Sequence, residues 1–218
     1  MCPLTAPVTV SQTGVNMTAQ DEVRLTPRER LLEAARELFY AEGVQSVGID
    51  RVIERAGVAK ASMYSTFGSK ENLVRAYLDE SHHRIIDARR SAAESATDSV
   101  SAILAVFDSQ ALDFERPGYN GCAFAGARAE APAGGLIDEA TRSFRQDLRD
   151  LFRGLCIQAG AADPDQLAWQ LQLLYSGGGE GAKLDREPGI AAVQRAAVET
   201  VLRASLTKRP LQRSGRKR

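Results

Sequence analysis

Apolar positions recur at helical spacing from the first part of the chain onward. A helix is predicted to begin at Thr26, which can cap it, with Pro27 in the first turn and Glu29 completing a capping box. Gly43 is a natural end for this helix. Two short helices over 49–56 and 60–66 follow, separated by a tight turn at 57–59, and a long helix covers 70–95. The first helix has an apolar face formed by Leu31, Leu32, Ala35, Leu38 and Phe39.

Every later periodic segment is also helical. Apolar stripes over 100–114, 136–155, 163–175 and 190–202 have the period of a helix, and 122–130 is a short segment rich in small residues. The composition of 116–121 indicates a loop, and Asp163 begins another capping box. No segment alternates as a half-buried strand does, so the predicted fold is all-α.

The two short helices predict a helix-turn-helix, because Gly57 allows the backbone conformation that the turn requires. The second helix presents lysine, hydroxyl groups and tyrosine on one side, and such a surface suits the major groove of DNA. Its other side is apolar. The positions spaced to pack against the first helix are Val52, Ala56, Val58, Met63 and Phe67.

Composition adds little beyond this picture, and charge adds an asymmetry. Hydrophobic residues make up 44% and charged residues 26% of the 218, which is ordinary for a globular protein. The net charge is zero, but 24–75 has a net charge of +2, 76–206 of −6 and 207–218 of +6. A basic block on an acidic body suggests a polyanion at one end. The chain lacks a membrane-length apolar run and the pattern of a secretory signal, so we expect a cytoplasmic protein.

The stretch from Ala56 to Leu73, AGVAKASMYSTFGSKENL, resembles the signature of the TetR family of transcriptional regulators. The resemblance implies an N-terminal three-helix, helix-turn-helix DNA-binding domain at 25–75 and a larger helical ligand-binding and dimerisation body at 76–206. Residues 1–24 are expected to be a disordered extension and 207–218 a basic disordered tail. Met17 is an alternative start to Met1, and the tail is either solvated or a non-specific DNA contact.

Carried over position by position, the resemblance implies a DNA-binding set on the two short helices and at the start of the long one. Gly48 and Ala59 depart from the family, because capping threonine and serine are usual at those positions. Asp50 would repel phosphate, so it caps its helix, pairs with a basic neighbour, or accepts a hydrogen bond from a cytosine amine. The expected DNA-binding residues are Ile49, Asp50, Lys60, Ala61, Ser62, Tyr64, Thr66 and Lys70.

The body offers weaker candidates. Aromatic residues and one histidine are expected to line a ligand pocket, although each is equally compatible with plain core: Tyr77, His82, Phe107, Phe124 and Trp169. The glycine run at 177–179 indicates either a helix break or close approach of a partner helix. Close packing is favoured, which places a dimer interface at Leu174, Gly178, Ala182, Val193, Ala197 and Val201.

The predicted function is a ligand-responsive transcriptional regulator without a cofactor, most simply a repressor. It binds a palindromic operator as a homodimer and is released by a small molecule. The alternatives are a DNA-binding protein without a small-molecule switch, which would have a sealed body, and an enzyme. Two histidines and three dispersed cysteines make no recognisable metal site, and no phosphate-binding loop or nucleophile motif is present.

Overall fold

The computed structural model describes residues 25–206, which form nine helices and no strand within that range. The all-α prediction is confirmed. The predicted N-terminal extension with Met17 and the predicted basic tail lie outside the described residues. None of the described helices is long and apolar enough to cross a membrane.

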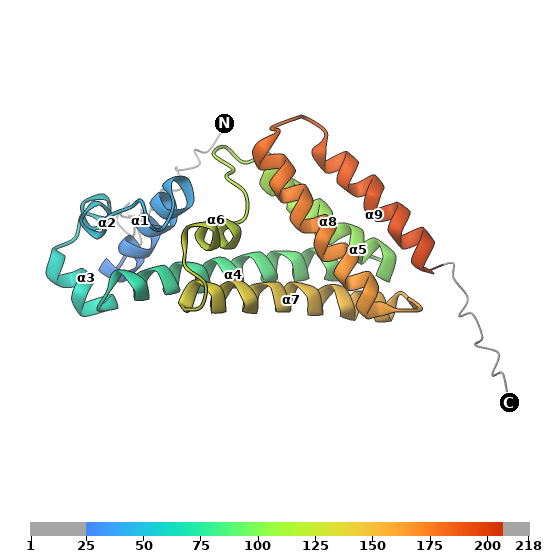
Figure 1. Ribbon diagram of the computed structural model, residues 1–218, viewed down its shortest axis with the longest axis horizontal. Helices are drawn as coiled ribbons and strands as arrows, with labels where there is room; N and C mark the ends of the chain where they lie inside the picture. Colours follow the sequence, from blue (N-terminus) through green and yellow to red (C-terminus); the bar gives the residue numbers. More distant parts are fainter. Residues whose placement is uncertain (1–24, 207–218) are drawn as a thin grey trace, which may run out of the picture.

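The first three helices form a small unit at one end of the molecule (Figure 1). They are α1 (Pro27–Glu42), α2 (Ile49–Ala56) and α3 (Lys60–Phe67), and α4 (Lys70–Glu94) leads from them into the body. The capping box predicted for Thr26 and Glu29 is present in full, and Gly43 ends α1. The inward faces of these helices meet in a buried apolar core that includes Leu31, Phe39, Val52, Met63 and Leu73.

The body is a bundle in which α4 runs beside α7 (Leu136–Gln158), and the short α6 (Ala123–Glu130) packs across both (Figure 1). At the far end, α5 (Ser99–Phe114), α8 (Pro164–Leu184) and α9 (Ile190–Leu206) pack together. Phe107 stacks on Phe152 with ring centroids 5.4 Å apart, and Tyr175 meets both rings edge-on. The long α4 crosses the predicted boundary at 75/76 without a break.

The glycine run at 177–179 lies inside α8, which continues through it. A Cβ on Gly178 would fall 2.1 Å from Nε2 of Gln194, a buried side chain of α9 in the same chain. The close approach at Gly178 is therefore made by α9 of the same chain, and Gly179 faces Gln110 of α5, whose Nε2 would lie 3.1 Å from a Cβ there. This corrects the expectation that Gly178 faces a partner subunit.

Candidate functional site

The turn between α2 and α3 is fixed by backbone and side-chain contacts. Gly57 has a left-handed backbone with φ of 61°, and its carbonyl accepts a hydrogen bond from Nη1 of Arg30 at 3.1 Å. The Val58 N–H donates to the carbonyl of Ile53 at 3.3 Å. These contacts fix the orientation of α3 against α1 and α2, so one side of α3 is buried and the other faces solvent.

The exposed side of α3 contains the residue types expected from the sequence. Lys60, Ala61, Tyr64 and Thr66 are exposed, whereas Met63 and Phe67 are buried beneath them. Tyr64 leaves 46% of its surface in solvent, which is high for a tyrosine on a helix that packs against α1, α2 and α4. Its ring is therefore accessible on the solvent-facing side of α3.

The remaining predicted residues flank this surface. Ser62 is half-buried, and its carbonyl accepts hydrogen bonds from the hydroxyl groups of Ser65 and Thr66. Ile49 is half-buried against the core at the start of α2. Neither Gly48 nor Ala59 provides a side-chain cap, so the first N–H groups of α2 and α3 have no capping side chain. Uncapped helix N-termini favour anions.

Asp50 forms an ion pair with Lys60, with Oδ1 and Nζ 2.7 Å apart. Of the three roles considered for Asp50, the one observed is the ion pair with a basic neighbour. The hydrogen bond from Lys60 to this carboxylate, with its charge, raises the pKa of the lysine. The ammonium group of Lys60 is therefore partly neutralised by a carboxylate on α2.

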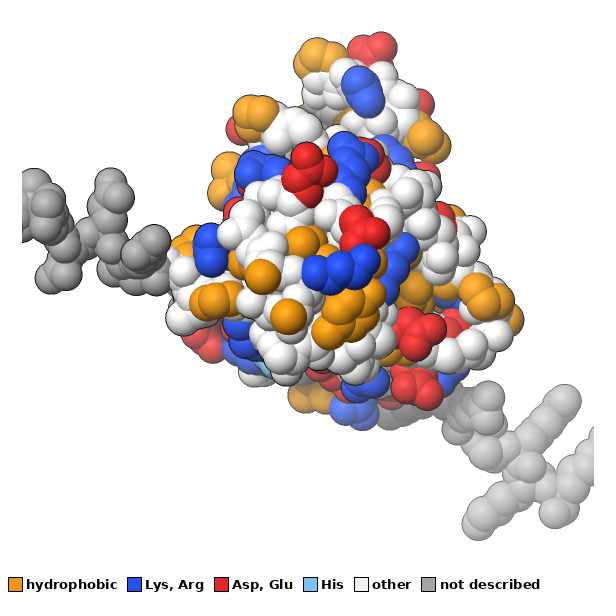
Figure 2. All heavy atoms as spheres, turned by 90° about the vertical axis from the view of Figure 1, so that its left-hand side faces the viewer, with side chains coloured by type: hydrophobic (Ala, Val, Ile, Leu, Met, Phe, Trp, Pro, Cys, Tyr) orange, Lys and Arg blue, Asp and Glu red, His pale blue; other side chains and the backbone are white. Residues whose placement is uncertain are grey.

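Lys70 is the first residue of α4, which begins at the cap Ser69, whose Oγ accepts from the Asn72 N–H at 3.2 Å. Nδ2 of Asn72 also donates to the carbonyl of Phe67 at 2.8 Å, which ties the end of α3 to α4. The lysine Nζ reaches the carbonyl of Gln45 at 3.4 Å. The face at this end of the molecule presents basic and acidic groups side by side (Figure 2), so its charge pattern is mixed.

The comparisons with known proteins agree with this geometry. A family model described as "Bacterial regulatory proteins, tetR family" matches residues 31–77. A solved TetR-family transcriptional regulator from Streptomyces coelicolor is 34% identical, with a TM-score of 0.78 over 83% of this chain and 96% of that chain. The chain belongs to the TetR family. This is a family of DNA-binding transcriptional regulators, not of enzymes.

Further TetR-family relatives support the assignment. A putative TetR transcriptional regulator from Streptomyces avermitilis is 31% identical, with a TM-score of 0.75 over 83% of this chain and 98% of that chain. The transcriptional activator FasR from Mycolicibacterium smegmatis is 35% identical over 85 residues, or 37% of this chain and 39% of FasR. The matched part thus spans about two fifths of that curated relative.

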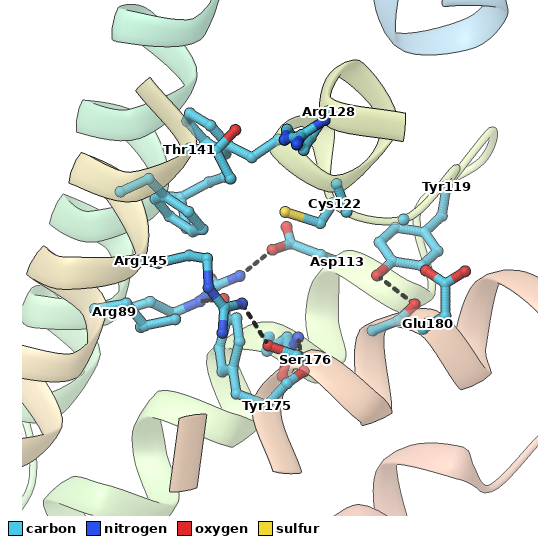
Figure 3. A pocket seen from close by; sticks show the side chains of 18 of the residues that line it. Arg89, Asp113, Tyr119, Cys122, Arg128, Thr141, Arg145, Tyr175, Ser176 and Glu180 are labelled. Carbon is cyan, nitrogen blue, oxygen red and sulfur yellow. Dashed lines mark hydrogen bonds and ion pairs between the residues drawn. The ribbon is translucent and has the colours of Figure 1, made fainter. Parts of the chain in front are cut away.

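A cavity of about 470 Å³ lies inside the body, between α4, α5, α6, α7 and α8 (Figure 3). Most of its wall is apolar. Phe124 and Phe144 form a parallel stack with ring centroids 4.2 Å apart on one side, and Tyr175 lies on another. The thiol of Cys122 points into the space, and burial raises its pKa.

Of the five pocket residues predicted from the sequence, only Phe124 lines this cavity. Tyr77 packs edge-on against Phe39 where α4 leaves the small unit formed by α1, α2 and α3, and Phe107 lies in the aromatic core. His82 lies outside the stacked pair, with edge-on contacts to both rings and Nε2 2.9 Å from a carboxylate oxygen of Asp147. Trp169 is 49% exposed on the surface of α8 with Arg149 over its ring, so its expected place in the cavity is wrong.

Sequence reasoning missed the polar network of the wall. Arg89 is almost fully buried and donates to the Tyr175 hydroxyl at 2.9 Å, to Ser109 and to Asp113. Burial raises the pKa of Tyr175 to about 12, and the adjacent guanidinium opposes the shift. The one available signal was the register of α4, because Arg89 follows Ile85 and Ile86 on the inward face.

The positions expected at a dimer interface differ in how far their own chain covers them. Leu174, Ala182, Ala197 and Val201 are half-buried, and the carbonyl of Leu174 accepts a hydrogen bond from Gln194. Only Val193, with 69% of its surface exposed, points fully outward. The large exposed apolar residues that the sequence missed on α8 are Trp169, Leu173 and Leu184.

Proposed function

We propose that this protein is a ligand-responsive transcriptional regulator, most simply a repressor, that binds a palindromic operator as a homodimer. The observation that carries the DNA-binding half is the solvent-facing side of α3, where Tyr64 and Lys60 project above a fully buried opposite side. In a helix-turn-helix protein such a helix enters the major groove, with Lys70 at the start of α4 against a phosphate. The remaining contacts of the proposed DNA surface come from Ile49, Asp50, Ala61, Ser62 and Thr66.

The homodimer follows from exposed apolar surface on the last two helices. Leu173 is 62% exposed and Val193 69%, and both lie on helices that form one end of the body (Figure 1). Large apolar side chains left in solvent on neighbouring helices are candidates for an interaction site, and a twofold partner would cover them. Two recognition helices then meet successive major grooves, about 34–36 Å apart.

The small-molecule switch is favoured over a DNA-binding protein without one by the size of the cavity. A volume of about 470 Å³ falls within the usual range of roughly 300–1,000 Å³ for ligand pockets, and the wall is mostly apolar. A sealed body would have argued for the alternative.

The contacts between the cavity and the DNA-binding unit suggest how a ligand acts. The segment from Tyr119 to Cys122 lines the cavity, and Asn120 within it binds Tyr40 near the end of α1. The Asn120 N–H donates to the Tyr40 hydroxyl at 2.9 Å, and Nδ2 donates to the Tyr40 carbonyl at 2.8 Å. The Tyr40 hydroxyl in turn donates to the Gly121 carbonyl at 3.0 Å.

The other end of α6 makes a second connection. A carboxylate oxygen of Glu130 accepts from the Gln45 N–H at 2.8 Å, in the loop that precedes α2. A ligand that displaces α6 or the 119–122 segment therefore moves the DNA-binding unit at Tyr40 and Gln45, and any tilt of α4 moves Lys70 with it. Such coupling free energies are typically about 1–3 kcal/mol.

The test uses an operator selected from a random DNA pool. We expect the double variant Lys60→Ala, Lys70→Ala to remain folded, to lose operator affinity and to show a shallower dependence on salt. Arg90→Ala is the matched control, because this exposed arginine lies on α4 but in the body. An operator affinity of the double variant equal to that of the wild type would contradict the proposed surface. Whether bound protein represses or activates depends on the operator's position; the relative FasR is by name an activator.

A further inference from the structure

The chemical class of the ligand is indicated by which charges on the cavity wall already have partners. Arg89 is paired with Asp113, and Arg128 is paired with Asp138, whose carboxylate oxygen lies 2.6 Å from Nε. Arg116 also reaches Asp113, at 3.1 Å. Arg89 and Arg128 are therefore available to a ligand only if the ligand breaks an existing ion pair.

Arg145 differs from them. It extends from α7 to the cavity and is half-buried, and its side chain donates one hydrogen bond, from Nη1 to the Ser176 hydroxyl at 3.3 Å (Figure 3). Among the described residues no carboxylate lies within 4 Å of its guanidinium group, although 14 ion pairs occur in this part of the chain. A guanidinium group has five N–H donors in a fork that matches a carboxylate, so most of its capacity is unused.

The second unpaired charge on the wall is Glu180, one helical turn after Ser176 on α8. Its residue is exposed, and Figure 3 shows its carboxylate beside Tyr119, across the cavity from the side chain of Arg145. Solvent screens a carboxylate in that position, whereas the half-buried guanidinium is screened less. The positive group is therefore the stronger determinant of ligand charge.

We propose that the effector is a compound with an apolar body and one anionic oxygen group, such as a carboxylate or sulfonate. The apolar body packs on Phe124, Phe144 and Leu148, and the anion binds Arg145 with Ser176 beside it. This inference deepens the proposed function and rests on it, since it takes the cavity to be the effector site. A charge-assisted bond to a partly buried arginine selects an anion over a neutral compound of the same shape.

Two dyes of nearly equal shape test the proposal. 1-Anilinonaphthalene-8-sulfonate has an apolar aromatic body with one sulfonate, and N-phenyl-1-naphthylamine is the same body without it. Fluorescence titration of the full chain should show that Arg145→Gln weakens binding of the anionic dye about tenfold or more, the usual effect of losing a hydrogen bond to a charged group. The affinity for the neutral dye should not change, and Arg145→Lys should restore part of the anionic dye's affinity.

The matched control is Arg142→Gln, which removes the same charge from the same helix. Arg142 is exposed, does not line the cavity and has its nearest carboxylate, Asp138, at 3.7 Å. Dye bound on the exposed apolar face of α8 would be insensitive to both substitutions. Equal affinity of the anionic dye for wild type and Arg145→Gln, or tighter binding of the cationic dye ethidium than of the anionic dye, would overturn the proposal.

Operator affinity measured at saturating dye separates this inference from the proposed function. If the neutral dye releases the operator while Arg145 has no effect on the anionic dye, the ligand class is wrong and the switch stands. If binding of the anionic dye depends on Arg145 but neither dye changes operator affinity, the anion site stands and the switch loses its support.

Discussion

The ion pair between Asp50 and Lys60 gives a sharp prediction about DNA binding. Lys60 Nζ lies 2.7 Å from Asp50 Oδ1, and both side chains are mostly exposed. Asp50→Asn removes the carboxylate but keeps the shape, so Lys60 becomes free to neutralise a phosphate. Because exposed ion pairs contribute little to stability, the thermal unfolding midpoint should stay where it is.

The magnitude follows from counterion release. Each phosphate that a protein neutralises adds about 0.9 to the slope of log affinity against log salt concentration. A homodimer gains two such contacts, so the slope should steepen by about 2. Lowering salt from about 0.2 M to 0.05 M should then strengthen the variant roughly tenfold more than the wild type.

The assay is fluorescence anisotropy of labelled operator at several salt concentrations. Glu54→Gln is the matched control, because it removes the same charge from the same helix and has no ion pair with Lys60 within the described residues. If the slope does not change, Asp50 does not restrain Lys60. If affinity falls and the preferred base changes at one cytosine, Asp50 reads that base and the reasoning from the ion pair is refuted.

Three further predictions concern the body. Asn120→Ala removes the 2.8 Å hydrogen bond to the Tyr40 carbonyl, which is worth about 1 kcal/mol. In paired titrations, the factor by which ligand and operator weaken each other's binding should fall by up to about fivefold. Unchanged coupling in a folded variant would rule out this route. Gly178→Ala should destabilise the fold by about 1–3 kcal/mol, because the new Cβ meets Gln194. Gly177→Ala has open space around it and should stabilise the fold by roughly 0.5–1 kcal/mol. Equal thermal unfolding midpoints of the two variants would contradict the described packing. Leu173→Glu should sediment as a monomer, because an unpaired charge buried at an interface costs several kcal/mol. Leu112→Glu, at an equally exposed site on α5, should remain a dimer. A dimeric Leu173→Glu variant would place the interface elsewhere.

The sequence was sufficient for the parts of the fold that local chemistry determines. Thr26, Gly43 and Gly57 mark helix ends because capping and left-handed backbone depend on a few neighbouring atoms. The exposed and buried sides of α3 followed in the same way, because one short helix packs on a single neighbouring unit.

The body was harder to predict because α8 contacts α5, α7 and α9. Such a helix is apolar around most of its surface, so periodicity does not say which apolar residue remains outside. The periodicity favoured Leu174 for the outer face of α8, but Leu173 is the residue that lies there. It also favoured Trp169 for the cavity, but half of the Trp169 surface is exposed to solvent. The cavity wall combines residues from five helices, and no local pattern records that Arg145 would be left without a carboxylate partner.

The most direct test of the central claim is selection of bound sequences from a random DNA pool by the full chain. The account predicts a palindromic consensus with half-sites about one helical turn apart, and loss of that enrichment with Lys60→Ala, Lys70→Ala. Recovery of no consensus, or of the same consensus with the same enrichment by the double variant, would contradict it.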